Sequence, residues 1–146
     1  YSRFRFVMAF KEQSTYSSVQ FVNAMIKAFP FKIECIQTDN GLEFIKSFDE
    51  RKKGKFSLFE ARLKELGIRH KLIRPFTPRH NGKVERSHRK DNEYFYATHK
   101  FYSFEDFKKQ LSVHLRWYNS FPMRPLHWKS PKQYILDYLH EGLLHN

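Results

Sequence analysis

Two carboxylates stand out because of the elements expected around them. Asp39 directly follows an apolar run that suits a short buried strand, and Glu85 stands about one turn into a helix that begins at Asn81 or Gly82. Ligands bind at the carboxyl ends of strands in open α/β sheets, so Asp39 would stand at such a site. Mg²⁺ takes oxygen ligands and is often held by one or two carboxylates together with substrate phosphates. Two such ions about 4 Å apart could activate an attacking oxygen and stabilise a leaving one in phosphodiester chemistry.

Each carboxylate also has an ordinary structural explanation. Asp-Asn-Gly at residues 39–41 is a turn sequence, and its Asp can simply bond to the local backbone. A Glu in the first turn of a helix is favoured by the helix dipole alone. Spacing and composition therefore leave the catalytic and the structural interpretation open for both residues.

The chain carries a large excess of positive charge. Lys and Arg total 27 against 15 Asp and Glu, which gives a net charge of +12 at pH 7. This excess favours an anionic partner, with nucleic acid the leading candidate, although a merely soluble basic domain has the same composition. With 40% hydrophobic and 18% aromatic residues, the sequence is too apolar for a disordered chain. Its 146 residues are enough for one domain with its own core.

Cys35 is the single cysteine, so no disulfide can form within the chain, and a reducing cytoplasm fits this composition. It lies in an apolar run and is expected to be a small buried hydrophobic residue. The eight histidines form no zinc-binding pattern with it. No apolar stretch approaches the roughly 20 residues that a membrane span needs, and no membrane partner is expected.

Basic and polar side chains surround Glu85 in the predicted helix. His88, Arg89 and Asn92 stand three, four and seven positions after it, on the same helix face. A helix start offers backbone N–H groups and nearby cations to phosphates. The residues predicted to contact DNA are Arg79, His80, Lys83, Arg86, His88, Arg89, Lys90 and Asn92. Such contacts would go mostly to phosphates and would position DNA without reading its sequence; the alternative is an ordinary solvated basic face.

Three segments are expected to be strands that position these side chains. Residues 2–10 alternate, with aromatic and Met side chains on one face, which is the period of a strand. Residues 31–38 contain Ile33, Cys35 and Ile36 and suit a short, largely buried strand, and residues 68–74 are expected to form a second buried strand. The polar and charged segment 46–55 is expected to be an exposed insertion.

Helices are predicted between and after the strands. Ser14 or Thr15 can cap one helix, which Pro30 stops, and another starts near Ser57 and ends with Gly67 as its C-terminal cap. Strands that alternate with helices favour an α/β sheet covered by helices, with no evident domain boundary.

Two further helices are expected near the end of the chain. Ser103 begins a capping-box pattern ahead of a long apolar stripe, and Ser130 can cap a last short helix. Trp117 and Tyr118 on the longer of these helices are interpreted as packing residues, not as platforms for stacked bases.

Three motifs resemble one known family. The stretch QTDNGLEF at residues 37–44 resembles the second-aspartate motif of the integrase core found in insertion-sequence transposases and retroviral integrases. RPFTP at 74–78, followed by NGKVER at 81–86, resembles the glutamate motif of that family. A third resemblance is to the end of the same domain in bacterial transposases, and it is carried by WYN at 117–119, RPL at 124–126 and SP at 130–131.

This resemblance implies an α/β, RNase H-like fold in which helices flank a mixed sheet. It makes Asp39 the second catalytic aspartate and Glu85 the catalytic glutamate, both as ligands of Mg²⁺ or of Mn²⁺ as a substitute, with two ions in a complete site. Their spacing is wider than is usual in the family, and the charged segment 46–55 accounts for the extra length. Glu43 matches a non-catalytic position of the motif.

The chain departs from the family pattern in two places. The first catalytic aspartate of the family precedes the position that matches Tyr1, and residues 1–10 resemble the third strand of the family. We therefore expect an N-terminally truncated core over residues 1–139 and a tail over 140–146. Missing strands would leave backbone groups unpaired, so this piece is expected to be unstable or aggregation-prone, and inactive alone. Arg79 and His80 stand where many relatives carry Gln and a small residue.

By resemblance, the activity is DNA transposition or integration. A DDE-type polynucleotidyl transferase would cleave DNA ends with a metal ion and join them to target DNA. A homo-oligomer would hold the ends together, in the cytoplasm at the bacterial nucleoid. One alternative is a non-catalytic, basic nucleic-acid-binding remnant. Another is an RNase H-like nuclease on a different nucleic acid, which the resemblance at residues 130–131 disfavours.

Overall fold

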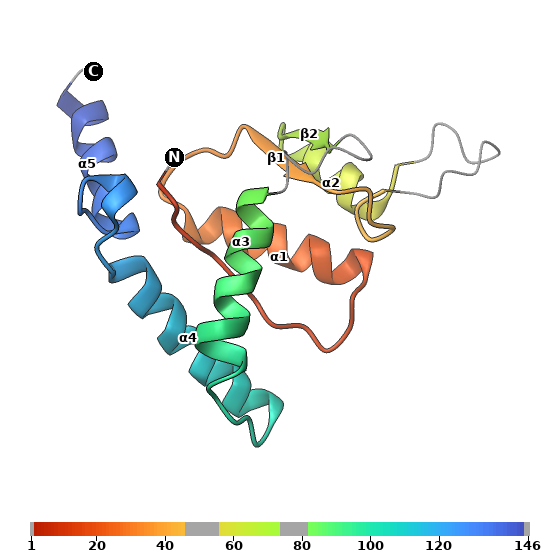
Figure 1. Ribbon diagram of the computed structural model, residues 1–146. Coiled ribbons are helices and arrows are strands. Elements are labelled where there is room, and N and C mark those ends of the chain that lie inside the picture. Colours follow the sequence, from red (N-terminus) through yellow and green to blue (C-terminus); the bar gives the residue numbers. More distant parts are fainter. Residues whose placement is uncertain (1, 46–55, 74–81, 145–146) are drawn as a thin grey trace. The chain divides into compact units, whose positions relative to one another are not determined.

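The computed structural model describes residues 2–45, 56–73 and 82–144 (Figure 1). The α-helices are α1 (Thr15–Ala28), α2 (Leu58–Glu65), α3 (Gly82–Asp91), α4 (Phe104–Ser120) and α5 (Pro131–Leu144). Two short strands, β1 (Cys35–Thr38) and β2 (Arg69–Leu72), lie on either side of α2 in the sequence. A π-helical turn at Asn92–Tyr96 follows α3, and a 3₁₀ turn at Arg124–Leu126 precedes α5. The predicted insertion 46–55 and most of the glutamate-motif loop lie outside the described residues.

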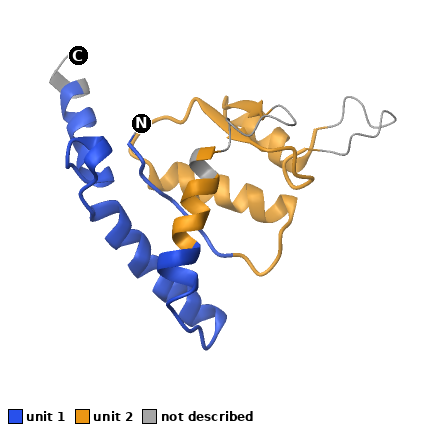
Figure 2. Cartoon of the chain, viewed as in Figure 1, with its two compact units in different colours: residues 1–9, 92–146 blue, residues 10–91 orange. Residues whose placement is uncertain are grey.

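The chain divides into two compact units (Figure 2). Unit 1 comprises residues Tyr1–Ala9 and Asn92–Asn146, and unit 2 comprises Phe10–Asp91. Both predicted catalytic carboxylates belong to unit 2. The predicted boundary between residues 139 and 140 falls inside α5, which runs on to Leu144.

The core of unit 2 forms where α1 and α2 pack together. Its buried side chains are Val22, Phe59, Leu63 and Ile68, each at most 8% exposed. The apolar positions of α1 recur at helical spacing, so Val19 and Ile26 also pack against this cluster. Burial of these apolar side chains holds the two helices together.

The helix ends of unit 2 follow the local sequence as predicted. Ser14 caps α1, because its hydroxyl accepts a hydrogen bond from the backbone N–H of Ser17 at 3.1 Å. Ser57 and Glu60 form a reciprocal capping box at the start of α2. After α2, Gly67 adopts a left-handed conformation with φ of 65°, which a glycine tolerates without a steric penalty.

The described sheet is one parallel pair. β1 and β2 align with Cys35 opposite Arg69 and Thr38 opposite Leu72, and α2 makes the crossover between them. A parallel pair joined by a helix is the arrangement expected of an α/β fold. Because each strand has a single neighbour among the described residues, both strands remain largely exposed. The prediction that they are buried was therefore wrong, and Cys35 is likewise exposed.

The predicted strand over residues 2–10 is not formed. A strand needs a hydrogen-bonded neighbour, and this segment pairs with neither β1 nor β2. Arg5 instead bonds to the side chain of Asn119 on α4. Its N–H donates to Asn119 Oδ1 at 2.9 Å, and its carbonyl accepts from Asn119 Nδ2 at 2.9 Å. The side-chain amide thus satisfies the backbone of Arg5 in place of a partner strand.

Unit 1 is centred on an aromatic cluster. Phe95 in the π-helical turn is fully buried, and its ring centroid lies 4.7 to 6.2 Å from the centroids of five others. These five rings belong to Tyr96, His99, Phe101, Phe107 and His114. The cluster joins the turn after α3 to the inner face of α4.

Serine caps begin both long helices of unit 1, as predicted. Ser103 accepts from the N–H of Asp106 at 3.0 Å, and the Asp106 carboxylate accepts from Tyr102 N–H, one residue before the cap position. Ser130 accepts from Gln133 N–H at 3.1 Å. The last helix is longer than predicted, with 14 residues.

Candidate metal and nucleic-acid site

Asp39 directly follows the carboxyl end of β1 and is exposed. Its Oδ1 accepts a hydrogen bond from the backbone N–H of Gly41 at 3.1 Å, so the local turn is present. That bond occupies one lone pair of the carboxylate, which has about four acceptor sites. The turn that the structural interpretation predicted therefore coexists with a carboxylate open to solvent at the end of a parallel strand.

Two contacts hold the segment around Asp39 against β2, and neither was predicted from the sequence. The hydroxyl of Thr38 lies 2.8 Å from His70 Nε2 on β2. The side chain of Asn40 donates to the carbonyl of Ile73 at 3.1 Å. The first contact joins the last residue of β1 to β2, and the second joins the loop after β1 to the residue that follows β2. Their signal in the sequence was weak, because partners more than thirty positions apart meet only through strand pairing.

His70 makes the stability of unit 2 sensitive to acid. Burial lowers the pKa of its imidazole below the ordinary value of 6.5, and the nearby Glu60 carboxylate opposes this shift. Because the folded pKa is the lower one, the unfolded chain binds the proton first as the pH falls. Stability contributed by neutral His70 is therefore complete above about pH 6.5 and is lost as the pH falls from there through the folded pKa.

We expect His70→Gln to weaken this dependence on pH. Urea unfolding of the unmodified chain, followed by circular dichroism, should show a lower midpoint at about pH 5.5 than at about pH 7.5. The variant should show a smaller drop, because glutamine can still bond to Thr38 but does not titrate. The remaining histidines are the same in both proteins, so they do not contribute to the difference between them. An equal drop in both proteins would show that His70 does not cause the acid sensitivity.

Glu85 lies in the first turn of α3, as the sequence predicted, and is exposed. The helix begins at Gly82, one of the two predicted starts. Among the described residues, no hydrogen bond or ion pair engages the Glu85 carboxylate. It is therefore open to an external cation.

The basic residues predicted around Glu85 are only partly described. Arg86, His88, Arg89 and Lys90 are exposed on α3, and none has an ion-pair partner within the described ranges. Lys83 is also part of α3, whereas Asn92 is exposed in the π-helical turn and belongs to unit 1. Arg79 and His80 lie outside the described residues. A run of exposed cations is thus confirmed on α3, and their contact with DNA stays a prediction.

The chemistry of the two carboxylates suits a hard divalent cation. Asp39 and Glu85 both offer exposed carboxylate oxygens, and Mg²⁺ commonly takes one or two carboxylates and fills its other positions with water and phosphate oxygens. In residues 2–45, 56–73 and 82–144, no three His, Cys, Asp or Glu side chains gather as a possible metal site. The pair therefore fits Mg²⁺ by donor type, and its convergence on one ion stays a prediction.

Part of the chain matches a known protein family. Residues 66–131 match the family model of the integrase core domain. This match covers just under half of the chain, and it includes Glu85 and α3 but not Asp39. No curated protein matches the chain.

A solved structure extends the comparison to nearly the whole chain. The crystal structure of the catalytic core domain of BIV integrase matches with a TM-score of 0.61 and 20% sequence identity. The match covers 93% of this chain and 80% of the BIV integrase chain. Likeness at this level of identity establishes the fold, which is that of an integrase catalytic core. The predicted resemblance and the predicted α/β, RNase H-like fold are both confirmed.

None of the described helices combines the length and the apolar character that a membrane crossing requires.

Proposed function

We propose that this chain is the catalytic part of an enzyme that cuts DNA ends and joins them to target DNA. The observation that carries the proposal is the placement of two exposed carboxylates within an integrase-core fold. Asp39 directly follows the carboxyl end of a parallel strand. Glu85 lies in the first turn of α3, which falls within the integrase-core match. At the level of the family, the match to this core supports DNA integration or transposition.

The proposed reaction consists of two displacements at phosphorus. Water attacks a phosphodiester at the end of the mobile DNA, and the bond to the 3′ oxygen breaks to release a 3′-hydroxyl. That hydroxyl then attacks a phosphodiester of the target, forms a new phosphodiester and displaces the 3′ oxygen of the neighbouring target nucleotide. The number of phosphodiester bonds is conserved in the second step, so it needs no external energy source.

Asp39 and Glu85 are the residues proposed to hold Mg²⁺, or Mn²⁺ in its place, with two ions in a complete site. When bound, such ions stabilise charge on the attacking and leaving oxygens of the phosphodiester. A third carboxylate is expected from the family resemblance. The exposed cations of α3, Arg86, Arg89 and Lys90, would hold phosphates near Glu85 by charge-assisted hydrogen bonds.

A homo-oligomer is part of the proposal, because joining a mobile element requires its two DNA ends to be held together. We place this reaction in the cytoplasm, at the bacterial nucleoid, in keeping with the resemblance of residues 117–131 to bacterial transposases.

A non-catalytic, basic nucleic-acid-binding protein is the second candidate. The observation that favours it is the surplus of positive charge, because binding to nucleic-acid phosphates requires no metal ligands. This candidate needs only the net charge of +12 and the exposed cations of α3. It predicts DNA binding that loses affinity with salt, without nicking or joining under any condition.

An assay of DNA nicking and joining separates the two candidates. The protein would carry this chain together with the upstream residues expected to supply the third carboxylate. Labelled element-end DNA would be incubated with a target plasmid in Mg²⁺, in Mn²⁺ or in excess chelator. Products that form with either metal and vanish with chelator support the enzyme. Binding without products under all three conditions supports the binding protein.

A further inference from the structure

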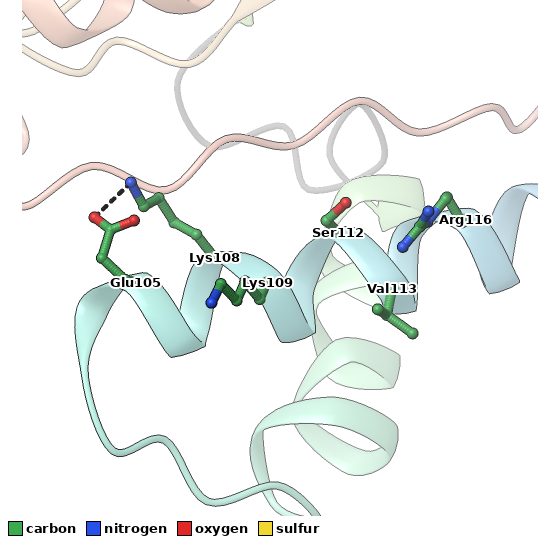
Figure 3. A pocket seen from close by; sticks show the side chains of 6 residues that line it. All are labelled: Glu105, Lys108, Lys109, Ser112, Val113 and Arg116. Carbon is green, nitrogen blue, oxygen red and sulfur yellow. Dashed lines mark ion pairs between the residues drawn. The ribbon is translucent and has the colours of Figure 1, made fainter.

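The outer face of α4 combines exposed cations with a shallow groove. The inner face of this helix packs on the aromatic cluster of unit 1, whereas its outer face is open to solvent. Six outer residues line a groove of about 410 Å³: Glu105, Lys108, Lys109, Ser112, Val113 and Arg116 (Figure 3). All six side chains project from α4, at spacings that keep them on one helix face.

The charge of this groove is not balanced by the described residues. Its one acid, Glu105, forms an ion pair with Lys108, with 2.7 Å between Oε1 and Nζ. Lys109 and Arg116 are exposed, and neither has an ion-pair partner in the described parts of the chain. Two positive charges are therefore left over, and the hydroxyl of Ser112 lies on the same face as a further hydrogen-bond donor.

The length of the groove suits a phosphate backbone. Lys108 and Arg116 are eight residues apart on α4, which at 1.5 Å per residue is about 12 Å along the helix. Phosphates of one DNA strand recur every 3.4 Å or so along the duplex axis, so this span covers roughly three to four of them. An Arg can pair with phosphate in a bidentate manner, and a Lys contributes a compact point charge.

We propose that the outer face of α4 is a second DNA-binding surface, which contacts backbone phosphates through Lys109, Arg116 and Ser112. This inference rests on the proposed function, because DNA is the anion that such an enzyme engages. The surface belongs to unit 1, whereas the cations around Glu85 belong to unit 2. Contacts to phosphate position DNA without reading its sequence, so the surface serves any DNA sequence equally.

The test is the salt dependence of binding to a fluorescent DNA duplex of arbitrary sequence, measured by anisotropy. Three forms of the full chain are compared: the unmodified chain, Lys109→Gln/Arg116→Gln and the control Lys100→Gln/Lys132→Gln. Lys100 and Lys132 are exposed residues of unit 1 outside the groove. Each double variant lowers the net charge of +12 by two, so any general charge effect is the same in both.

The groove variant should reduce the slope of log affinity against log salt by about 1.8, or about 0.9 for each phosphate that the two side chains no longer neutralise. Raising salt from about 50 to 200 mM should then weaken its binding roughly tenfold less than that of the unmodified chain. The control slope should stay close to the unmodified value.

Three other results would overturn the assignment in distinguishable ways. Equal slopes for the two double variants would show that DNA does not bind to the outer face of α4, and the proposed reaction would be unaffected. A slope change seen only with an RNA duplex would assign the surface to RNA. Failure of all three proteins to bind DNA would overturn both this surface and the DNA partner of the proposed function.

Discussion

Replacing Asp39 by asparagine, in a protein that also carries the upstream residues expected to supply the third carboxylate, should abolish metal-dependent DNA joining while leaving DNA binding unchanged. Asparagine keeps the shape of the side chain and the oxygen that accepts from Gly41, so the turn after β1 should survive. It removes the negative charge that a divalent cation requires of its ligand. Loss of an outer-shell partner of a metal costs about 10–100-fold in activity, so loss of a direct ligand should cost more than roughly 100-fold. The initial joining rate on labelled DNA ends measures this effect.

Glu43→Gln is the matched control for this variant. Glu43 is another carboxylate of the same motif, and it accepts a hydrogen bond from Gln13, which places it in a local structural contact. By the resemblance of residues 37–44 to the family motif, Glu43 is expected at a non-catalytic position, so its variant should join DNA at close to the unmodified rate. Equal losses from the two variants would point to a general effect of charge or folding. Retained joining by the Asp39 variant would return Asp39 to the role of a turn residue.

Replacing Phe95 by alanine should strongly lower the free energy of unfolding of unit 1. The side chain is 0% exposed and packs against the rings of His99, Phe101 and His114. Removing a buried Phe costs about 3–5 kcal/mol, because apolar burial is reduced and a cavity is left behind. Urea unfolding followed by tryptophan fluorescence reports on this unit, because both tryptophans, Trp117 and Trp128, belong to it.

Tyr94→Ala is the control for the Phe95 variant. Tyr94 precedes Phe95 in the same π-helical turn but is 62% exposed, so its removal should change the unfolding free energy by no more than about 0.5 kcal/mol. Comparable losses at the two positions would mean that the turn itself, and not burial of the Phe95 ring, holds unit 1 together.

Local signals in the sequence predicted the helices well. A serine hydroxyl at the N-cap position accepts a hydrogen bond from one of the first free N–H groups of a helix without help from distant residues. Ser14, Ser57, Ser103 and Ser130 all cap helices for this reason. Gly67 ends α2 by an equally local mechanism, since only its own backbone must turn left-handed.

The strands were predicted less well, because a strand depends on its neighbours. The alternation over residues 2–10 is a real pattern of side chains, but the backbone of Arg5 finds its partner in the amide of Asn119, more than a hundred residues away. Burial of β1 and β2 likewise depends on other strands beside them, and Cys35 is exposed for that reason. Composition within a run of residues does not contain this information.

In the candidate site, too, local features were predicted from the sequence and contacts between distant residues were not. Asp39 and Glu85 were identified from a turn, a helix start and motifs, and the structure confirms the local setting of each. The contact of Thr38 with His70 required the parallel register of β1 and β2. The groove on α4 was missed because its cations are spaced as any solvated helix face would be. Similarly, the prediction that Trp117 is a packing residue is only half right, since the side chain contacts His114 and Phe121 but is 53% exposed.

The central claim is that Asp39 and Glu85 act together on one reaction. The most direct test is the rate of metal-dependent joining by Asp39→Asn, Glu85→Gln and the double variant, each in a protein that carries the upstream residues. Residues that act as a unit are strongly non-additive, so the double variant should be no slower than either single variant. Joining that persists in either single variant, or a double loss equal to the product of the two single losses, would contradict the shared site.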